Sequence, residues 1–128
     1  MIVVMKQYEE DLFDGYKVQC TVVPMGVDYA VSVYGGSRSH AGCAVMAISR
    51  PSLTGKGRSC TSSVLNAVGH KDETVARFFA EAIAKEKNCT VVCTCGIHVD
   101  DITKEQLQSV IDCSERLLGS VLADLKEQ

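Results

Sequence analysis

Two stretches of helical periodicity, set among strand-like segments, most constrain the fold of this chain. The first begins near Asp72, predicted here to cap it, and its apolar residues at helical spacing are Val75, Phe78, Phe79, Ala82 and Ile83. The second begins at Thr103, which forms a capping box with Gln106 ahead of a leucine-rich stripe. A helix with one apolar face buries that face against another layer of structure. The sequence therefore predicts two amphipathic helices packed on a sheet.

The other segments have the composition and alternation of β-strands. The predicted strands cover residues 1–10, 16–25, 28–34, 43–49, 60–68 and the first half of 89–101. The first three are separated by short turn signals, which favours an antiparallel meander. The expected fold class is α+β, with an antiparallel sheet of about five to six strands and two helices packed on it. The expected domain organisation is a single domain over residues 1–128.

Size and charge exclude several classes of protein. A chain of 128 residues with 46% hydrophobic residues has the composition of one globular domain. Its net charge of −3 gives no sign of a nucleic-acid-binding or basic membrane-binding face. No apolar run approaches the roughly 20 residues that span a bilayer, and residues 1–5 lack signal-peptide features. We expect a cytoplasmic protein without nucleic-acid or membrane partners.

Seven cysteines are many for this length. Their number is odd and they lack the paired C-x-x-C spacing of a zinc ribbon, so reduced thiols used in packing are expected. In the last predicted strand, Cys93 and Cys95 share one face, while Thr94 and His98 lie on the other. The cysteines and His98 are therefore not expected to share a ligand.

Three glycine-bearing polar segments carry all three histidines. Residues 35–42 include Gly35, Gly36, Ser37, Arg38 and His40; residues 69–72 include His70, Lys71 and Asp72; and residues 96–101 include Gly96, His98 and Asp100. Glycines that permit positive φ let successive N–H groups converge on an anion, and serine and arginine side chains add donors. A flexible surface loop would have the same composition, so both interpretations stay open. Residues 52–59 are a further basic, glycine-rich loop that is either a lid or a solvated turn.

If these segments meet at one rim of the sheet, the histidines form a candidate metal site. His40, His70 and His98 would each supply a nitrogen, and Asp72 or Asp100 an additional oxygen. Isolated turn histidines are more often capping or surface groups, and that alternative also stays open. The chain contains no nucleophile elbow, H-E-x-x-H motif or G-x-G-x-x-G motif. A rim with Arg38, Lys71 and many backbone donors suits a phosphate-bearing ligand.

The three segments, in this order, resemble the prenylated-flavin chaperone family typified by LpdD, an accessory protein of gallate decarboxylase. The resemblance runs from about residue 31 to residue 111. It implies a non-catalytic carrier that binds prenylated FMN, hands it to a UbiD-type decarboxylase, has a fold similar to proteasome-assembly chaperones, and forms a homodimer. The expected cofactor-binding residues are Gly35, Gly36, Ser37, Arg38, His40, Lys71 and Gly96, and the expected metal ligands are His40, His70, His98, Asp100 and Asp72.

Two other functions remain open from the sequence. In a small metal-dependent enzyme, the same histidines would hold a catalytic ion and Asp100 would act as the base. In a protein-only assembly factor, the rim would contact another protein and bind no cofactor.

Overall fold

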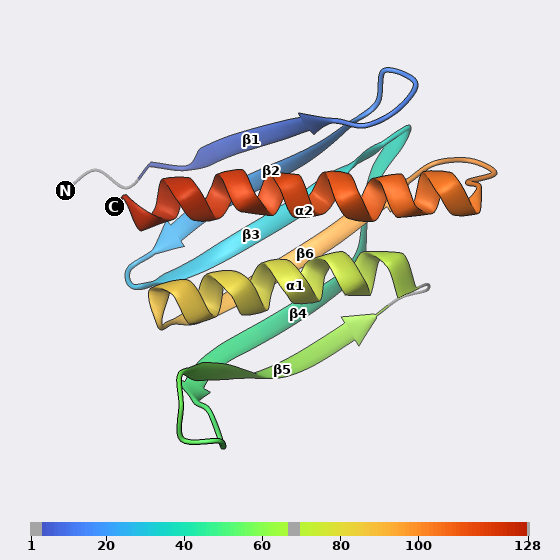
Figure 1. Cartoon of the computed structure of the whole chain (residues 1–128). Coiled ribbons are helices and arrows are strands. Elements are labelled where there is room, and N and C mark those ends of the chain that lie inside the picture. Colours follow the sequence, from blue (N-terminus) through green and yellow to red (C-terminus); the bar gives the residue numbers. More distant parts are fainter. Residues whose placement is uncertain (1–3, 67–69, 128) are drawn as a thin grey trace.

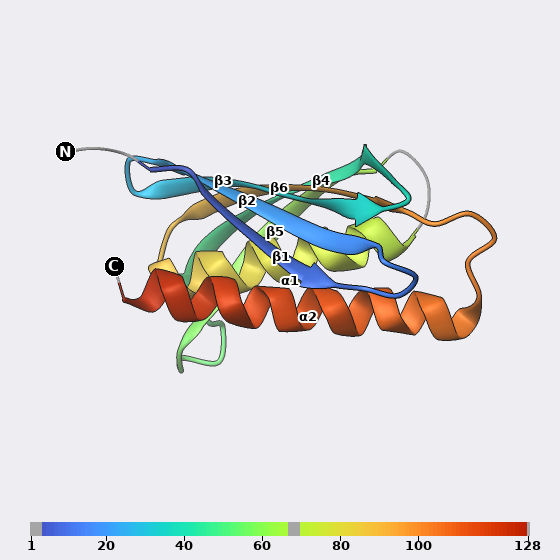
Figure 2. The same ribbon diagram turned by 90° about the horizontal axis from the view of Figure 1, so that it is seen from above.

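The computed structural model describes residues 4–66 and 70–127. It contains six strands and two helices: β1 (Lys6–Asp11), β2 (Lys17–Met25), β3 (Asp28–Gly36), β4 (Arg38–Pro51), β5 (Arg58–Asn66), α1 (His70–Lys87), β6 (Thr90–His98) and α2 (Lys104–Lys126). The strands form one sheet, and both helices lie on the same side of it (Figures 1 and 2). The predicted α+β architecture of two layers is confirmed.

The order of strands across the sheet is β1-β2-β3-β6-β4-β5. Neighbouring strands are antiparallel except β3 and β6, which are parallel. The last strand therefore enters between β3 and β4, although β3 and β4 are joined by a single residue, Ser37. The parallel pair was not predicted, because alternation along a strand carries no information about which strand lies beside it.

Several element boundaries differ from those predicted. β4 begins at Arg38, so most of the predicted loop 35–42 belongs to strands. α1 begins at His70, so the prediction that Asp72 caps this helix is wrong. Residues 1–3 of the first predicted strand and residues 67–68 of the fifth lie outside the described residues, as does Gly69.

The core lies between the sheet and the helices. The largest fully buried side chains there are those of Phe79, Ile83, Ile97, Leu117 and Leu125, with many valines from the strands. All seven cysteines are free, and six of them are buried. Burial raises the pKa of Cys20 to about 12 and that of Cys89 to about 11, so these thiols are neutral packing groups. Neither helix in the part of the chain that the structure describes combines the length and the apolarity needed to cross a membrane.

The predicted capping box at the start of α2 is present. The Thr103 hydroxyl accepts a hydrogen bond from the Gln106 N–H at 3.0 Å, and the Gln106 side chain accepts one from the Thr103 N–H at 3.1 Å. Thr103→Ala should lower the free energy of unfolding by about 1 kcal/mol, because the Gln106 N–H in the first turn loses its partner. Ser120→Ala is the matched control on the same helix, since its hydroxyl bonds only the preceding turn at Arg116. Urea titrations of both variants compare the two losses; equal losses would contradict the capping role.

Candidate functional site

The site lies at the end of the sheet where β3 and β6 finish, β4 starts and α1 begins (Figure 1). Gly36 and Arg38 flank His98 on its two sides, so the chain crosses the end of β6 at Ser37. The Ser37 N–H and hydroxyl both donate to the His98 carbonyl, at 2.7 and 3.1 Å. We call this end of the sheet the rim, comprising residues 35–42, 70–72 and 96–100.

The glycines at the crossing are required by packing. Gly36 has φ +80°, and a Cβ there would overlap the carbonyl oxygen of His98; a Cβ at Gly35 would overlap that of Lys17. Because the Ser37 N–H already bonds His98, it is not free to join a set of N–H groups around an anion. The cofactor-binding role of Gly35, Gly36 and Ser37 stays a prediction, and their conformations are explained without a ligand.

A wide bulge in β4 brings His40 to the rim. Ser39 pairs with Ile97 and Cys43 with Cys95, so residues 40–42 stand opposite the single residue Gly96. A Cβ at Gly96 would overlap the carbonyl oxygen of His40, so only glycine leaves room for this bulge. Bulges of this kind redirect side chains next to functional sites. We call residues 40–42 the β4 bulge.

Asp72 is the buried centre of the rim, with its side chain only 5% exposed. Its carboxylate accepts hydrogen bonds from the Ile97 N–H at 3.1 Å and from the Lys71 ammonium at 2.8 Å. The His40 Nε2 lies 3.4 Å from its other oxygen. The Lys71 ammonium also donates to the carbonyl of Ile97. One carboxylate therefore joins α1, β6 and the β4 bulge. The Lys71 ammonium bonds both Asp72 and the Ile97 carbonyl.

The second histidine of the rim is His98. Its Nε2 lies 2.8 Å from Asp100 Oδ1. This hydrogen bond lowers the pKa of Asp100, and the charge of Arg38 acts in the same direction. The rings of His40 and His98 meet edge to face, with centroids 6.2 Å apart. The structure thus brings together two of the three histidines, each beside a carboxylate.

His70 is placed differently from the other two histidines. It is the exposed first residue of α1, and its carbonyl accepts a hydrogen bond from Thr74. Within residues 4–66 and 70–127, no group of three or more metal-binding side chains is arranged to hold an ion. The residues as they stand therefore do not fit the predicted metal site, and we derive no chemistry through a metal.

A hollow of about 450 Å³ lies beside the rim, on the side of the sheet away from the helices. Its lining residues are Thr21, Ser32, Val33, Tyr34, Ser39, His40, Ala41 and Thr94. An adjoining hollow of about 410 Å³ shares Ala41 and Thr94. Sequence reasoning missed the hydroxyl residues of these hollows. The sequence signal that could have identified them is a serine or threonine at a polar position in each of three predicted strands: Thr21, Ser32 and Thr94.

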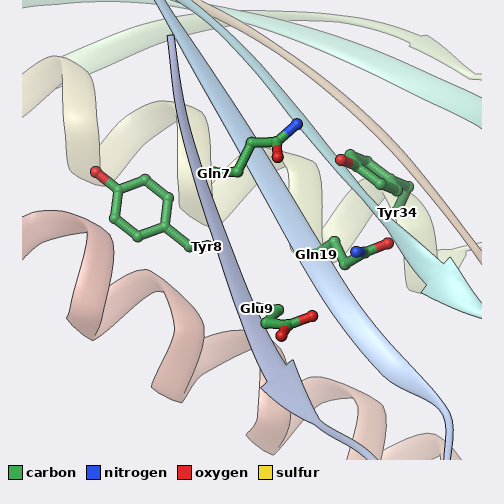
Figure 3. A pocket seen from close by; sticks show the side chains of 5 residues that line it. All are labelled: Gln7, Tyr8, Glu9, Gln19 and Tyr34. Carbon is green, nitrogen blue, oxygen red and sulfur yellow. The ribbon is translucent and has the colours of Figure 1, made fainter. Parts of the chain in front are cut away.

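A third hollow, of about 300 Å³, lies beyond Tyr34 and is lined by Gln7, Tyr8, Glu9 and Gln19 together with that tyrosine (Figure 3). Tyr8 turns toward α2, where its hydroxyl donates to Asp124, while the other side chains lie on the opposite side of the sheet. This hollow has a carboxylate and no cationic side chain in its lining, so it is less suited to a phosphate-bearing ligand than the rim.

The basic loop 52–59 lies at the other end of β4. It joins β4 to β5, and its turn is closed by hydrogen bonds between Ser52 and Gly57 and between Gly55 and Ser52. The rim residues are at the start of β4, whereas this loop follows Pro51. This loop therefore does not form a lid over the rim.

Comparison with known proteins bears on the fold and on the family. The fold matches a structure described as a chaperone complex for yeast 20S proteasome assembly, with a TM-score of 0.66 and 16% sequence identity over 99% of this chain and 98% of the other. This likeness shows the fold alone. No curated protein gave a significant match. The family model of the prenylated flavin chaperone LpdD-like domain matches residues 13–126, which include all the described rim residues. The chain therefore belongs to the prenylated flavin chaperone LpdD-like family.

Proposed function

We propose that this protein is a non-catalytic carrier of prenylated FMN that holds the phosphate of its cargo at the rim. The observation that carries the proposal is the convergence of His40 and His98, from different strands, at one end of the sheet. Arg38 is exposed beside them and supplies a permanent positive charge. Imidazole and guanidinium groups are donors that recognise phosphate. Family membership supplies the chemical identity of the cargo.

The experiment is a direct test of cargo retention. Purified protein is mixed anaerobically with prenylated FMN or with plain FMN, and free cofactor is removed by gel filtration. We expect a stoichiometric chromophore in the protein fraction with prenylated FMN, and less with plain FMN. No retained chromophore and no change in fluorescence would contradict the carrier function.

Arg38→Ala should weaken cargo binding without unfolding the domain. Loss of a hydrogen bond to a charged group costs about 1.5–3 kcal/mol, which corresponds to roughly tenfold or more in the dissociation constant. Stability should change by about 0.5 kcal/mol or less, because the side chain is exposed. Arg58→Ala is the matched control, since this arginine is exposed at the start of β5, far from the rim. Fluorescence titration and thermal melts measure both effects; a large fall in melting temperature for Arg38→Ala would contradict the assignment.

We further propose that the carrier is a cytoplasmic homodimer that delivers its cargo to a UbiD-type decarboxylase. A group of exposed apolar side chains on the sheet face away from the helices supports the homodimer. Its members are Val23 (37% exposed), Met25 (51%), Met46 (44%) and Ile48 (46%). Contiguous apolar surface of this kind marks protein interfaces. A second copy of the chain would cover it. Sedimentation velocity of the wild type and of Met46→Glu tests this: a dimer that the charge dissociates supports it, and a wild-type monomer refutes it.

The metal site stays a separate prediction. Binding of an ion by His40, His70, His98, Asp72 and Asp100 would require rearrangement of side chains that now pair with each other. Elemental analysis of the wild type and of His98→Ala tests it. Equal metal content in the two proteins would remove the histidine set as the site.

A further inference from the structure

The sheet face away from the helices is organised in rows that run across the strands. Paired positions place Thr21 beside Ser32, Ser32 beside Thr94, and Thr94 beside Ala44. The next row, one step farther from the rim, consists of Val23, Ala30, Val92 and Met46. A row of hydroxyl groups therefore lies directly beside a row of apolar side chains. We call these the hydroxyl row (Thr21, Ser32, Thr94) and the apolar row.

The hydroxyl row is organised by short contacts. The Thr21 and Tyr34 hydroxyls are 2.8 Å apart, and the Thr94 hydroxyl donates to that of Ser32 at 3.0 Å. A hydroxyl donates one hydrogen bond and accepts others, so such pairs can present either function to a ligand. These side chains are half-buried, which places their free hydrogen-bonding capacity at the surface of the hollow.

The hollow has a floor and two walls. Thr94 and Ser32 form the floor, Tyr34 stands on one side, and the β4 bulge rises on the other. A Cβ built on Gly96 would point into His40 and Ala41, which shows that the bulge lies on this face. Its volume of about 450 Å³ falls within the roughly 300–1,000 Å³ typical of ligand sites. It is therefore a structured recess, open to a ligand of moderate size.

We propose that this recess holds the ring system of the cargo, while the rim holds its phosphate. The proposal rests on the proposed carrier function and adds the location of the rings. A prenylated flavin has a pyrimidine edge with hydrogen-bond donors and acceptors and a broad apolar remainder. The hydroxyl row matches the former, and Val33, Ala41 and the ring of Tyr34, which also line the recess, match the latter. His40 lines the recess and also lies beside His98, so one ligand can occupy both places.

Filling the recess tests this assignment. Thr94→Phe places a large ring on the floor while keeping a residue that favours strands. Ser63→Phe is the matched control, since Ser63 lies on the same face opposite Met46 but lines neither hollow that contains Thr94. We expect the affinity of Thr94→Phe for prenylated FMN to fall about tenfold or more, and that of Ser63→Phe to stay within about twofold of wild type.

A second variant distinguishes loss of binding from misfolding. Thr94→Val keeps the branched shape and removes only the hydroxyl, and it should weaken prenylated FMN binding about threefold or more at an unchanged melting temperature. Inorganic phosphate should still compete with the cargo in this variant, because the rim is intact.

The outcomes separate the two claims. If the wild type binds no prenylated FMN, the carrier function fails and the ring site with it. If the wild type binds it and Thr94→Phe and Thr94→Val bind it equally well, the ring site is refuted while the carrier function stands. Selective loss in the Thr94 variants, with Ser63→Phe unaffected, supports both.

Discussion

Gly96→Ala should destabilise this protein more than any other single methyl group added to the rim. The new Cβ would overlap the carbonyl oxygen of His40 and lie 3.1 Å from the Ala41 nitrogen. Both atoms belong to the backbone, so no flexible side chain can move aside, and either the β4 bulge or the central strand must shift. Overpacking of this kind costs about 1–3 kcal/mol or more. We expect about 3 kcal/mol, measured by urea denaturation.

The matched control for this prediction is Gly119→Ala. Gly119 lies in α2, and a Cβ there would have no neighbouring atom within 4 Å. Alanine in a helix interior is favoured over glycine by about 0.8–1 kcal/mol, so this variant should be as stable as wild type or more so. If Gly96→Ala were as stable as Gly119→Ala, the described packing of the β4 bulge against β6 would be wrong.

Asp72→Ala should also destabilise the protein, by about 3 kcal/mol. The substitution removes the acceptor of the buried Ile97 N–H and the charge that pairs with Lys71. The Lys71 side chain is only 20% exposed, so its ammonium would stay largely desolvated, with the Ile97 carbonyl as a partner but no counter-charge. The value lies at the low end of the range for breaking a buried ion pair, because water still reaches part of this lysine. Denaturant titration at neutral pH measures it.

Two further variants identify the cause of that loss. In Asp100→Ala, an exposed carboxylate that also pairs with a histidine is removed, and little change in melting temperature is expected. In the double variant Asp72→Ala, Lys71→Met, part of the lost stability should return, because the ammonium that lacks a counter-charge is gone. Additive losses in the double variant would show that the ion pair is not the cause.

The layers of the fold were predictable from the sequence because they depend on local patterns. The stripe of α1 that includes Phe79 and Ile83 is buried as its periodicity indicates, and Thr103 caps α2 as its spacing with Gln106 predicts. The alternation around Thr94 correctly places Cys93 and Cys95 in the core. Each of these inferences uses residues within a few positions of each other.

The parts that were not predictable depend on contacts between distant residues. The insertion of β6 between β3 and β4 determines that Ser37 crosses the end of β6 and that the β4 bulge faces Gly96. From the sequence alone, residues 35–42 were therefore predicted to be a loop, although most of them belong to β3 and β4. The role of Asp72 was missed for the same reason, since its partner Ile97 is 25 positions away. The convergence of His40 and His98 was predicted, whereas His70 is the exposed first residue of α1 and its role as a metal ligand stays a prediction.

A crystal structure of the protein with prenylated FMN is the most direct test of where the cargo binds. We expect the phosphate to lie within hydrogen-bond distance of the Arg38 guanidinium, beside His40 and His98, and the rings to rest on Thr94 in the recess between Tyr34 and the β4 bulge. A cofactor bound on the helical side of the sheet, or at the β4–β5 turn, would contradict this placement.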